Sequence, residues 1–405
     1  MEDYWHRRHL ADACATTEQA VGEDSPVRYF EAVVEGVVPI PTGDLADWLD
    51  TPCDAVVLPA FEANRLRLEG TGYEGRLTEY AAKLLTRSER ADEDMVFGAA
   101  IWPCHDPGEI ERHIDRRIAA YAEQAAALER AGFDFLHIFD MQDLSEGRAA
   151  LLAAREATHL PVIVSVSCDE DGMVGEADVM ACLAVCQGIG CAAFGLSCYN
   201  RPDVVEEQLA RLYPYAAVPL FAKLDAYEQD GFEKNLMSPG RFAAHVRGCL
   251  ESGATSVFTG AGAVAEYAQL AGIELAGFSE CQITAGPKDE AAILSATSRE
   301  AHFIDPLLDI SEPLFVDTGL DEAIYDIEQS GVDAVKIHLR EVDDIELFSE
   351  SLYMLSLPLC LSADDLTLFE RAAMLYPGRA LYDGTCDFEE EKLRPILEKY
   401  GIIEL

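Results

Sequence analysis

The chain has 405 residues, of which 49% are hydrophobic, and its 74 acidic against 30 basic residues give a formal net charge of −44. This charge argues against nucleic acid or an anionic membrane as a partner, because the few cations cannot neutralise phosphates. The length and hydrophobic content indicate one large α/β domain followed by a smaller one.

The first twenty residues are polar and helix-like, and they lack the apolar core of a signal peptide. We interpret residues 2–20 as an amphipathic helix that caps the main domain. No run approaches the roughly 20 apolar residues that a membrane span needs. The 12 cysteines show neither disulfide-type spacing nor a CxxC motif, which favours reduced thiols and a cytoplasmic protein.

Short apolar runs alternate with amphipathic helical patterns through about the first 280 residues, a rhythm typical of parallel strands covered by helices. The predicted strands are Ala32–Ile40, Ala55–Leu58, Met95–Ile101, Phe135–Phe139, Val162–Val166, Ala192–Leu196, Leu220–Lys223 and Ser256–Phe258. Eight strands in this length predict an α/β fold of the TIM (β/α)8 barrel type. A doubly wound sheet is the alternative, and it is disfavoured because no GxGxxG motif follows an early strand.

The composition changes at about Ser279, and residues 279–405 hold 28 acidic against 9 basic residues. Further strands are predicted at Leu314–Val316, Ala334–Ile337, Pro358–Leu361, Ala380–Tyr382 and Gly401–Leu405. This part is too short for a second barrel of eight units. We therefore predict a TIM barrel over residues 1–278 and a small acidic α/β domain over residues 279–405.

Several predicted strands end in groups that ionise or bind metals. Asp140 ends the fourth strand, Cys168 follows the fifth and Cys198 follows the sixth, while Cys104 and His105 follow the third. Because the chemistry of a TIM barrel takes place at the carboxyl ends of its strands, we expect these side chains at one mouth. Thiolates and imidazoles are ligands that zinc prefers, so the three cysteines and His105 are candidate metal ligands.

Each candidate also has a plain structural interpretation. A cysteine is an ordinary small buried residue, Asp140 and Asp225 can cap loops, and Glu62 can cap a helix beginning near Asn64. Lys223 ends the seventh strand, where a lysine would suit lyase or aldolase chemistry. For Lys223 we favour a salt-bridged or solvated side chain over that role.

A set of short segments, in this order and spacing, resembles one known family. The segments are Phe61–Leu66, Tyr121–Gln124, Ala131–Asp134, Asp140–Met141, Leu160–Gly172 and Gly195–Cys198. Over roughly residues 50–275 the chain resembles the homocysteine S-methyltransferases and the homocysteine-binding barrel of methionine synthase. The resemblance implies a barrel in which three cysteines hold zinc, and the zinc binds the substrate thiol as the thiolate that attacks a methyl group.

The chain departs from this family at several site positions. Cys198 matches the zinc cysteine at the end of the sixth strand, but Gly260 and Ala261 stand where the family has a pair of cysteines. Asp140 takes the place of the family's substrate-binding glutamate, and Asp225 falls in the turn after the seventh strand. The resemblance implies substrate binding by Asp140, Asp225 and Glu62 and a zinc site that lacks two of its three ligands.

Two functions are predicted from these features. The first is methyl transfer to a small-molecule thiol at the mouth of the barrel, with a degenerate zinc site. The alternative is a non-catalytic binding or scaffold subunit of a methyl-transfer system. No cobalamin-binding D-x-H-x-x-G motif is present, so a corrinoid would have to be carried by a separate protein. The segments Pro358–Ser362 and Tyr376–Asp383 are faintly similar to pterin-binding barrels and do not define a pterin site.

Overall fold

The computed structural model describes residues 33–40, 53, 55–65, 67–68, 70, 72, 75–86, 95–103, 114–230, 233–305 and 307–405. The predicted helix over residues 2–20 lies outside this part of the chain. Two compact units are present. The barrel unit comprises residues up to 142, 149–172 and 191–288, and the C-terminal unit comprises residues 143–148, 173–190 and 289–405. Each unit is made of several chain segments, so this division does not test the predicted single boundary between residues 278 and 279.

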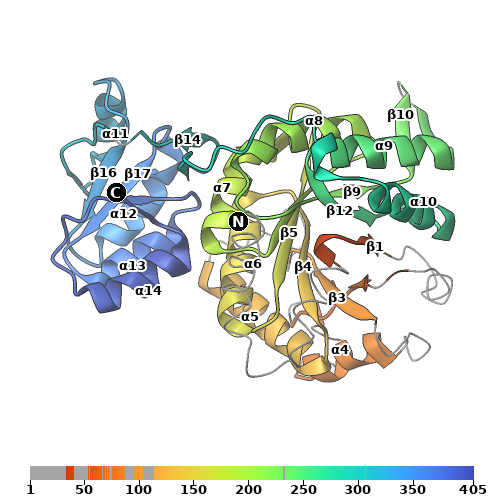
Figure 1. Ribbon diagram of the computed structural model, residues 1–405. Coiled ribbons are helices and arrows are strands. Elements are labelled where there is room, and N and C mark those ends of the chain that lie inside the picture. The colour runs from red at the N-terminus through yellow and green to blue at the C-terminus, as the bar shows by residue number, and fades with distance from the viewer. Residues whose placement is uncertain are drawn as a thin grey trace. The chain divides into compact units, whose positions relative to one another are not determined.

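The barrel unit is built on eight parallel strands in a nearly closed ring (Figure 1). The strands are β1 (Val37–Pro39), β2 (Ala55–Pro59), β3 (Val96–Ile101), β4 (Phe135–Met141), β5 (Val162–Cys168), β8 (Ala193–Cys198), β9 (Leu220–Leu224) and β12 (Ala254–Thr259). Their order around the ring follows their order in the chain, with β12 hydrogen-bonded to β1. The predicted TIM barrel is confirmed.

Helices alternate with these strands along the chain. They are α4 (Leu77–Thr86), α5 (Ile114–Ala131), α6 (Leu144–Ala157), α8 (Pro202–Leu212), α9 (Pro239–Glu251) and α10 (Ala265–Ala276). Helix α5 buries Ala120, Tyr121, Gln124 and Leu128, a spacing of three and four residues that places them on one face. Helix α9 begins where the Ser238 side chain accepts a hydrogen bond from the Arg241 backbone N–H.

Shorter elements complete the barrel unit. Two extended segments, β10 (Tyr227–Asp230) and β11 (Glu233–Leu236), form an antiparallel hairpin directly after β9. Short 3-10 turns lie at Tyr213–Tyr215 and Glu280–Gln282. The hairpin was not predicted from the sequence. Among the described residues, no helix has both the length and the apolar character needed to cross a bilayer.

The C-terminal unit contains a five-stranded parallel sheet of β15 (Leu314–Phe315), β16 (Val335–Leu339), β17 (Leu359–Ala363), β18 (Leu381–Tyr382) and β19 (Ile403–Glu404). Between them lie α11 (Leu320–Glu328), α12 (Asp344–Ser351), a 3-10 turn at Leu352–Met354, α13 (Leu366–Leu375) and α14 (Glu390–Tyr400). All five predicted strands of this region are present. The antiparallel hairpin of β13 (Leu294–Ala296) and β14 (Ala301–Phe303) was not predicted.

Helix α7 (Val179–Ile189) falls in a segment of the C-terminal unit, and the short hairpin of β6 (Met173–Val174) and β7 (Ala177–Asp178) precedes it. The Asp178 side chain accepts from the Met180 backbone N–H and so caps the first turn. Gly190 ends the helix at φ 96°, a left-handed conformation that glycine adopts without steric cost.

The strands of the C-terminal sheet lie in chain order. Right-handed crossovers between such strands place the connecting helices on one face of the sheet. Side chains alternate along β16, so Val335, Ile337 and Leu339 share one face, while Lys336 and His338 share the other. The register pairs Lys336 with Cys360 and His338 with Ser362. Polar and ionisable side chains of two strands therefore lie beside each other on the second face.

Two large aromatic rings fill the barrel interior next to glycines. A Cβ atom added to Gly195 would lie 2.2 Å from the ring of Phe221, and one added to Gly98 would lie 2.2 Å from the ring of Phe135. The rings of Phe221 and Phe258 are themselves 4.5 Å apart between centroids. The interior therefore has no room for a methyl group at these positions.

We predict that Gly195→Ala lowers the free energy of unfolding by about 1–3 kcal/mol, because overpacking displaces the ring of Phe221. The control is Gly272→Ala in α10, where an added Cβ meets nothing within 4 Å. That change should be neutral or stabilise the helix by up to about 1 kcal/mol. Urea denaturation, monitored by circular dichroism, measures the free energy of unfolding of both variants. A Gly195→Ala variant as stable as the control would contradict the packing described here.

Candidate functional site

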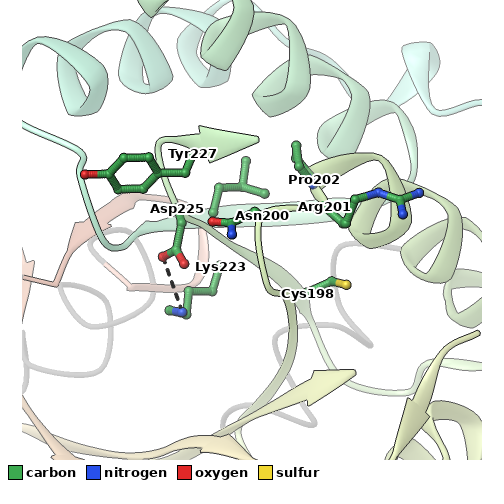
Figure 2. Close-up of a pocket in the computed structure, with 8 residues that line it drawn as sticks. Cys198, Asn200, Arg201, Pro202, Lys223, Asp225 and Tyr227 are labelled. Carbon is green, nitrogen blue, oxygen red and sulfur yellow. Dashed lines mark ion pairs between the residues drawn. The ribbon is translucent and has the colours of Figure 1, made fainter. Parts of the chain in front are cut away.

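A buried lysine and two aspartates occupy the mouth of the barrel, at the carboxyl ends of β4 and β9. The Nζ atom of Lys223 lies 2.6 Å from Asp140 Oδ2 and 3.5 Å from Asp225 Oδ1. Figure 2 shows Lys223 and Asp225 pointing toward each other. The side chains of Lys223, Asp140 and Asp225 are 9, 10 and 16% exposed. Of the two states that the sequence analysis left open for Lys223, the structure shows the salt-bridged one.

Two serines from neighbouring strands hold the Asp140 carboxylate. Ser165 Oγ in β5 and Ser197 Oγ in β8 donate to Asp140 Oδ1, at 3.1 and 3.0 Å. The backbone N–H of Asp140 donates to Ser165 Oγ at 2.9 Å. The carboxylate thus accepts from two hydroxyls through one oxygen and pairs with Lys223 through the other, which fixes its orientation.

The charge of Lys223 persists despite its burial. Burial alone would lower the pKa of Lys223, but the charges of Asp140 and Asp225 and their hydrogen bonds outweigh it, so the pKa is raised. The lysine is therefore an ammonium at neutral pH. With both partners ionised, the three side chains carry a net charge of −1, which favours a cationic group of a ligand.

Backbone strain marks the same mouth. Among the described residues other than glycine, Asp140 (φ 43°) and Asn200 (φ 54°) have positive φ. Asn200 follows β8, is only 2% exposed, and its Oδ1 atom has no hydrogen-bond partner. Strained backbone and an unpaired buried acceptor each cost free energy, and both concentrate at sites that bind ligands.

Asn200 lines a small hollow at this mouth, drawn in Figure 2. The side chains that surround the hollow come from the ends of β8 and β9 and the segments that follow them. They are Cys198, Asn200, Arg201, Pro202, Lys223, Leu224, Asp225 and Tyr227. The hollow thus brings together a thiol, an amide, an ammonium and a carboxylate.

Cys168 and Cys198 are directly opposite each other in the pairing of β5 with β8. A hydrogen bond from the thiol of Cys168 lowers the pKa of Cys198, and the charge of Arg201 adds to this effect against the opposing effect of burial. The same hydrogen bond, together with burial, raises the pKa of Cys168. Cys198 is therefore the member of the pair that ionises first.

A histidine lies deeper in the barrel, beneath the ion pair. The ring of His137 is surrounded by Phe139, Phe221 and Phe258, at centroid distances of 5.3, 5.6 and 5.3 Å. Its Nε2 lies 2.8 Å from Ser165 Oγ, and its Nδ1 has no partner. Because the hydroxyl of Ser165 donates to a carboxylate, its oxygen accepts, and His137 Nε2 carries the proton. Burial and the charge of Lys223 lower the pKa of His137 to about 3.

The residues after β12 do not build the zinc site of the family that the sequence resembles. Gly260 and Ala261 have no side-chain donors, and a Cβ on Gly260 would lie 2.2 Å from Asp225 Oδ1. The backbone N–H of Ala261 donates to the same oxygen at 2.8 Å. No group of three or more histidine, cysteine, aspartate or glutamate side chains placed to hold a metal occurs in the described part of the chain. The cysteine pair that the resemblance implies after β12 therefore has no counterpart at Gly260 and Ala261.

The other sequence-predicted residues divide into three groups. Asp140, Cys168, Cys198 and Asp225 belong to strand ends or loops at this mouth. Glu62 lies exposed in a turn after β2, and no contact of its side chain with the mouth is described. Cys104 and His105 lie outside the described residues, so their proposed role in a metal site stays a prediction.

The sequence analysis missed the hydroxyls that support Asp140. Ser165 and Ser197 lie within mostly apolar strands, Val162–Cys168 and Ala193–Cys198, the first of which also contains Ser167. A polar residue in a strand buried on both faces signals an internal partner, so this pattern was available. Asn200 gave no comparable signal, because its strain and its unpaired oxygen exist only in the folded chain.

Comparisons with known proteins agree on the barrel. The family model described as homocysteine S-methyltransferase matches residues 45–264. A methionine synthase of Mycobacterium leprae is 31% identical over 116 residues, 27% of this chain and 10% of that protein. One of Mycobacterium tuberculosis is 30% identical over 107 residues, 25% of this chain and 9% of that protein. The matched part thus spans about a tenth of these relatives.

Solved structures of low sequence identity are also similar to the chain. The oxidized form of the homocysteine methyltransferase MmuM from Escherichia coli is 13% identical, with a TM-score of 0.49, over 60% of this chain and 98% of that one. Its metallated form is 14% identical, with a TM-score of 0.46, over 65% of this chain and 89% of that one.

We predict that His137 makes the chain less stable as the pH falls below about 6.5, the pKa of an unfolded histidine. Between pH 6.5 and about 3 the unfolded chain binds a proton at this position and the folded chain does not. The free energy of unfolding therefore falls by about 1 kcal/mol per pH unit from this group. His137→Gln removes the titration and should reduce the slope by that amount between pH 6 and 5. An unchanged slope in urea denaturation would contradict a neutral buried imidazole.

Proposed function

The chain belongs to the homocysteine S-methyltransferase family, and on that premise we propose that its barrel transfers a methyl group to a small thiol without the family's zinc centre. The observation that carries this proposal is the Lys223 ammonium. It is held by Asp140 and Asp225, and Asp225 in turn fills the space that a side chain at Gly260 would need. A fixed positive charge thus lies beside the position of the missing cysteine pair.

The mouth offers acceptors for an ammonium group of the substrate. The net charge of −1 on Lys223, Asp140 and Asp225 favours a cation, and the unpaired Oδ1 of Asn200 accepts a hydrogen bond. Pairing a buried acceptor recovers the free energy that it costs when left alone. An amino-acid thiol such as homocysteine carries the required ammonium and a nucleophilic sulfur on one small molecule.

Lys223 also supplies a means to activate the thiol. A thiol beside an ammonium loses its proton more readily, because the positive charge stabilises the thiolate. The sulfur then attacks the methyl carbon of a sulfonium donor, forming the new S–CH3 bond as the donor's S–CH3 bond breaks. The donor leaves as a neutral thioether, and the thiol proton goes to the Asp225 carboxylate. A single charge stabilises a thiolate less than zinc does, so we expect slow turnover.

The alternative function is a non-catalytic binding or scaffold subunit of a methyl-transfer system. The observation that favours it is that two carboxylates already neutralise Lys223, so the ammonium has less effect on a bound thiol. A corrinoid carried by a separate protein would then be the methyl donor for another component. Binding and turnover of homocysteine distinguish the two functions.

We predict that purified full-length protein converts homocysteine to methionine with S-adenosylmethionine as the sulfonium donor, and that Lys223→Met lowers this rate by about a hundredfold or more. Lys223→Arg, which keeps the charge, should retain part of the rate. The control is Lys288→Met, because Lys288 bonds the Ala216 carbonyl oxygen and stacks over Tyr213, and no contact with the mouth residues is described. Mass spectrometry of the methionine formed measures the rate for the unsubstituted protein and the three variants.

The outcomes separate the proposals. Undiminished turnover in Lys223→Met would contradict a role for the ammonium. If the unsubstituted protein binds homocysteine in calorimetry and forms no methionine, the binding subunit is supported. If it neither binds nor converts homocysteine, both proposals fail.

We predict further that the metal chelator 1,10-phenanthroline changes the methyl-transfer rate by less than about twofold, since no described residues form the zinc centre. Cys198→Ser should likewise retain turnover. Zinc content by mass spectrometry and the transfer rate are measured on the same samples. If Cys198→Ser abolishes both zinc binding and methyl transfer, Cys198 is a metal ligand and this prediction is wrong.

A further inference from the structure

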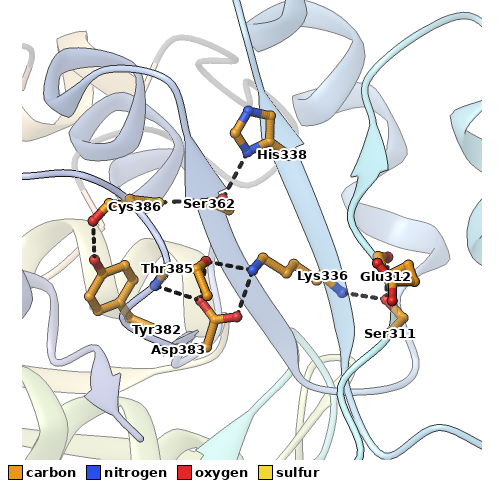
Figure 3. A network of polar contacts seen from close by, with 9 residues as sticks. All are labelled: Ser311, Glu312, Lys336, His338, Ser362, Tyr382, Asp383, Thr385 and Cys386. Atoms are coloured by element: carbon orange, nitrogen blue, oxygen red, sulfur yellow. Dashed lines mark hydrogen bonds and ion pairs between the residues drawn. The ribbon is translucent and has the colours of Figure 1, made fainter.

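The C-terminal unit has a second cluster of ionisable and nucleophilic side chains, drawn in Figure 3. Most of it lies toward the carboxyl ends of the parallel strands, with His338 from β16, Ser362 from β17, and Asp383 and Cys386 from the segment after β18. Lys336 comes from the amino-terminal part of β16, and its Nζ atom reaches Asp383. In sheets of this kind ligands bind outside the carboxyl ends of the strands. This cluster belongs to neither function proposed for the barrel.

Three contacts connect the thiol of Cys386 to a carboxylate. The Sγ atom of Cys386 lies 3.3 Å from Ser362 Oγ, which lies 2.8 Å from His338 Nδ1. The Nε2 atom of the same ring lies 3.0 Å from Asp364 Oδ1. The four side chains form one continuous path from a nucleophile through a base to an orienting carboxylate, the arrangement that activates weak nucleophiles.

The path has a direction. An ionised Asp364 can only accept, so Nε2 of a neutral His338 carries the proton and its Nδ1 is the acceptor. Ser362 therefore donates its hydroxyl proton to Nδ1, and its oxygen accepts from the Cys386 thiol. A proton leaving Cys386 is thus relayed through Ser362 to His338, where Asp364 stabilises the resulting imidazolium.

Exposure identifies the group that a ligand can reach. Ser362 is 3% exposed and lies inside the unit, whereas Cys386 is half-buried. The side chain of Asp364 is 62% exposed and that of His338 is 17% exposed. The serine is a relay within the path, and the cysteine is the nucleophile at its accessible end.

A buried ion pair anchors the segment that carries Cys386. The Nζ atom of Lys336, whose side chain is 8% exposed, lies 2.6 Å from both Asp383 Oδ2 and Thr385 Oγ1. The hydroxyl of Tyr382 donates to the Cys386 carbonyl oxygen at 3.3 Å. Burying charges is costly unless they are paired, so this pair holds the segment and places a cation beside the residue that precedes Cys386.

We propose that Cys386 is a nucleophilic thiol activated through Ser362 by His338, at a site that takes a small electrophilic carbonyl compound. The sulfur attacks the carbonyl carbon, an S–C bond forms, and the π pair of the C=O bond moves onto oxygen. The thiol proton passes to His338 through Ser362 and from there to that oxygen, which gives a hemithioacetal. No oxidant or further reactant is needed.

The test uses the full-length protein and iodoacetamide, which alkylates the thiol with loss of iodide. Peptide mass spectrometry follows each cysteine at pH 7. The internal control is Cys281, which is exposed and lies 3.0 Å from the Ser279 hydroxyl. We expect Cys386 to react about tenfold or more faster than Cys281 although it is less exposed. His338→Gln should remove this advantage and leave the rate at Cys281 unchanged.

A second variant tests the role of the carboxylate, and a buried cysteine shows whether each variant is folded. Asp364→Asn, at an exposed position, should slow Cys386 alone by a smaller factor. Cys360 is fully buried, and its continued protection shows that each variant is folded. Propanal as the carbonyl probe should compete with alkylation at Cys386 and not at Cys281.

Two results would overturn the proposal. In folded protein, a Cys386 that reacts no faster than Cys281, or one that is unaffected by His338→Gln, excludes activation through the path. Absence of protection by propanal excludes the carbonyl class of ligand. Neither result bears on methyl transfer by the barrel, which is measured separately.

Discussion

The ion pair between Lys223 and Asp140 is the interaction on which the mouth of the barrel depends. Both side chains are about nine-tenths buried, and removing one partner from such a pair typically costs about 3–5 kcal/mol because the other charge is left alone. The two serines and the strained backbone at Asp140 serve this pair by fixing the carboxylate. His137 lies beneath it and stays neutral, because burial lowers its pKa and the positive charge of Lys223 lowers it further.

The same pair bears on how the chain relates to its family. A metal ion and an ammonium both present positive charge to a substrate, but they place different demands on the protein. Zinc needs several thiolates or imidazoles in tetrahedral reach, while an ammonium needs carboxylates that match its charge. At Gly260 the chain leaves room for Asp225 and offers no thiolate. The carboxylates at this mouth therefore match the charge of Lys223, while Gly260 stands where the family has a zinc-binding cysteine.

The barrel and the C-terminal unit share one physical principle. In each, parallel strands bring together side chains that are distant in the sequence. They meet near the carboxyl ends of the strands, where polar residues follow apolar ones. In the barrel this arrangement brings together Asp140 and Lys223, and in the C-terminal sheet it brings together Lys336 and Asp383. In each unit a buried lysine is paired with an aspartate, and a partly buried cysteine belongs to the same group of strand ends.

Hydrophobic periodicity predicted the eight strands of the barrel, because each is covered on both faces and reads as a short apolar run such as Val162–Val166. The first strand is shorter than predicted, since β1 covers only Val37–Pro39 of Ala32–Ile40. The periodicity also located the strand ends, and with them Asp140, Cys168, Cys198 and Asp225. The exposed hairpin after β9 was missed, because Glu233–Leu236 has no buried face to create a pattern. Which groups meet across the mouth was decided by tertiary structure. Asp140 and Lys223 come from the fourth and seventh strands of the barrel, so their pairing, the strained backbone of Asn200 and the lowered pKa of His137 exist only in the folded chain.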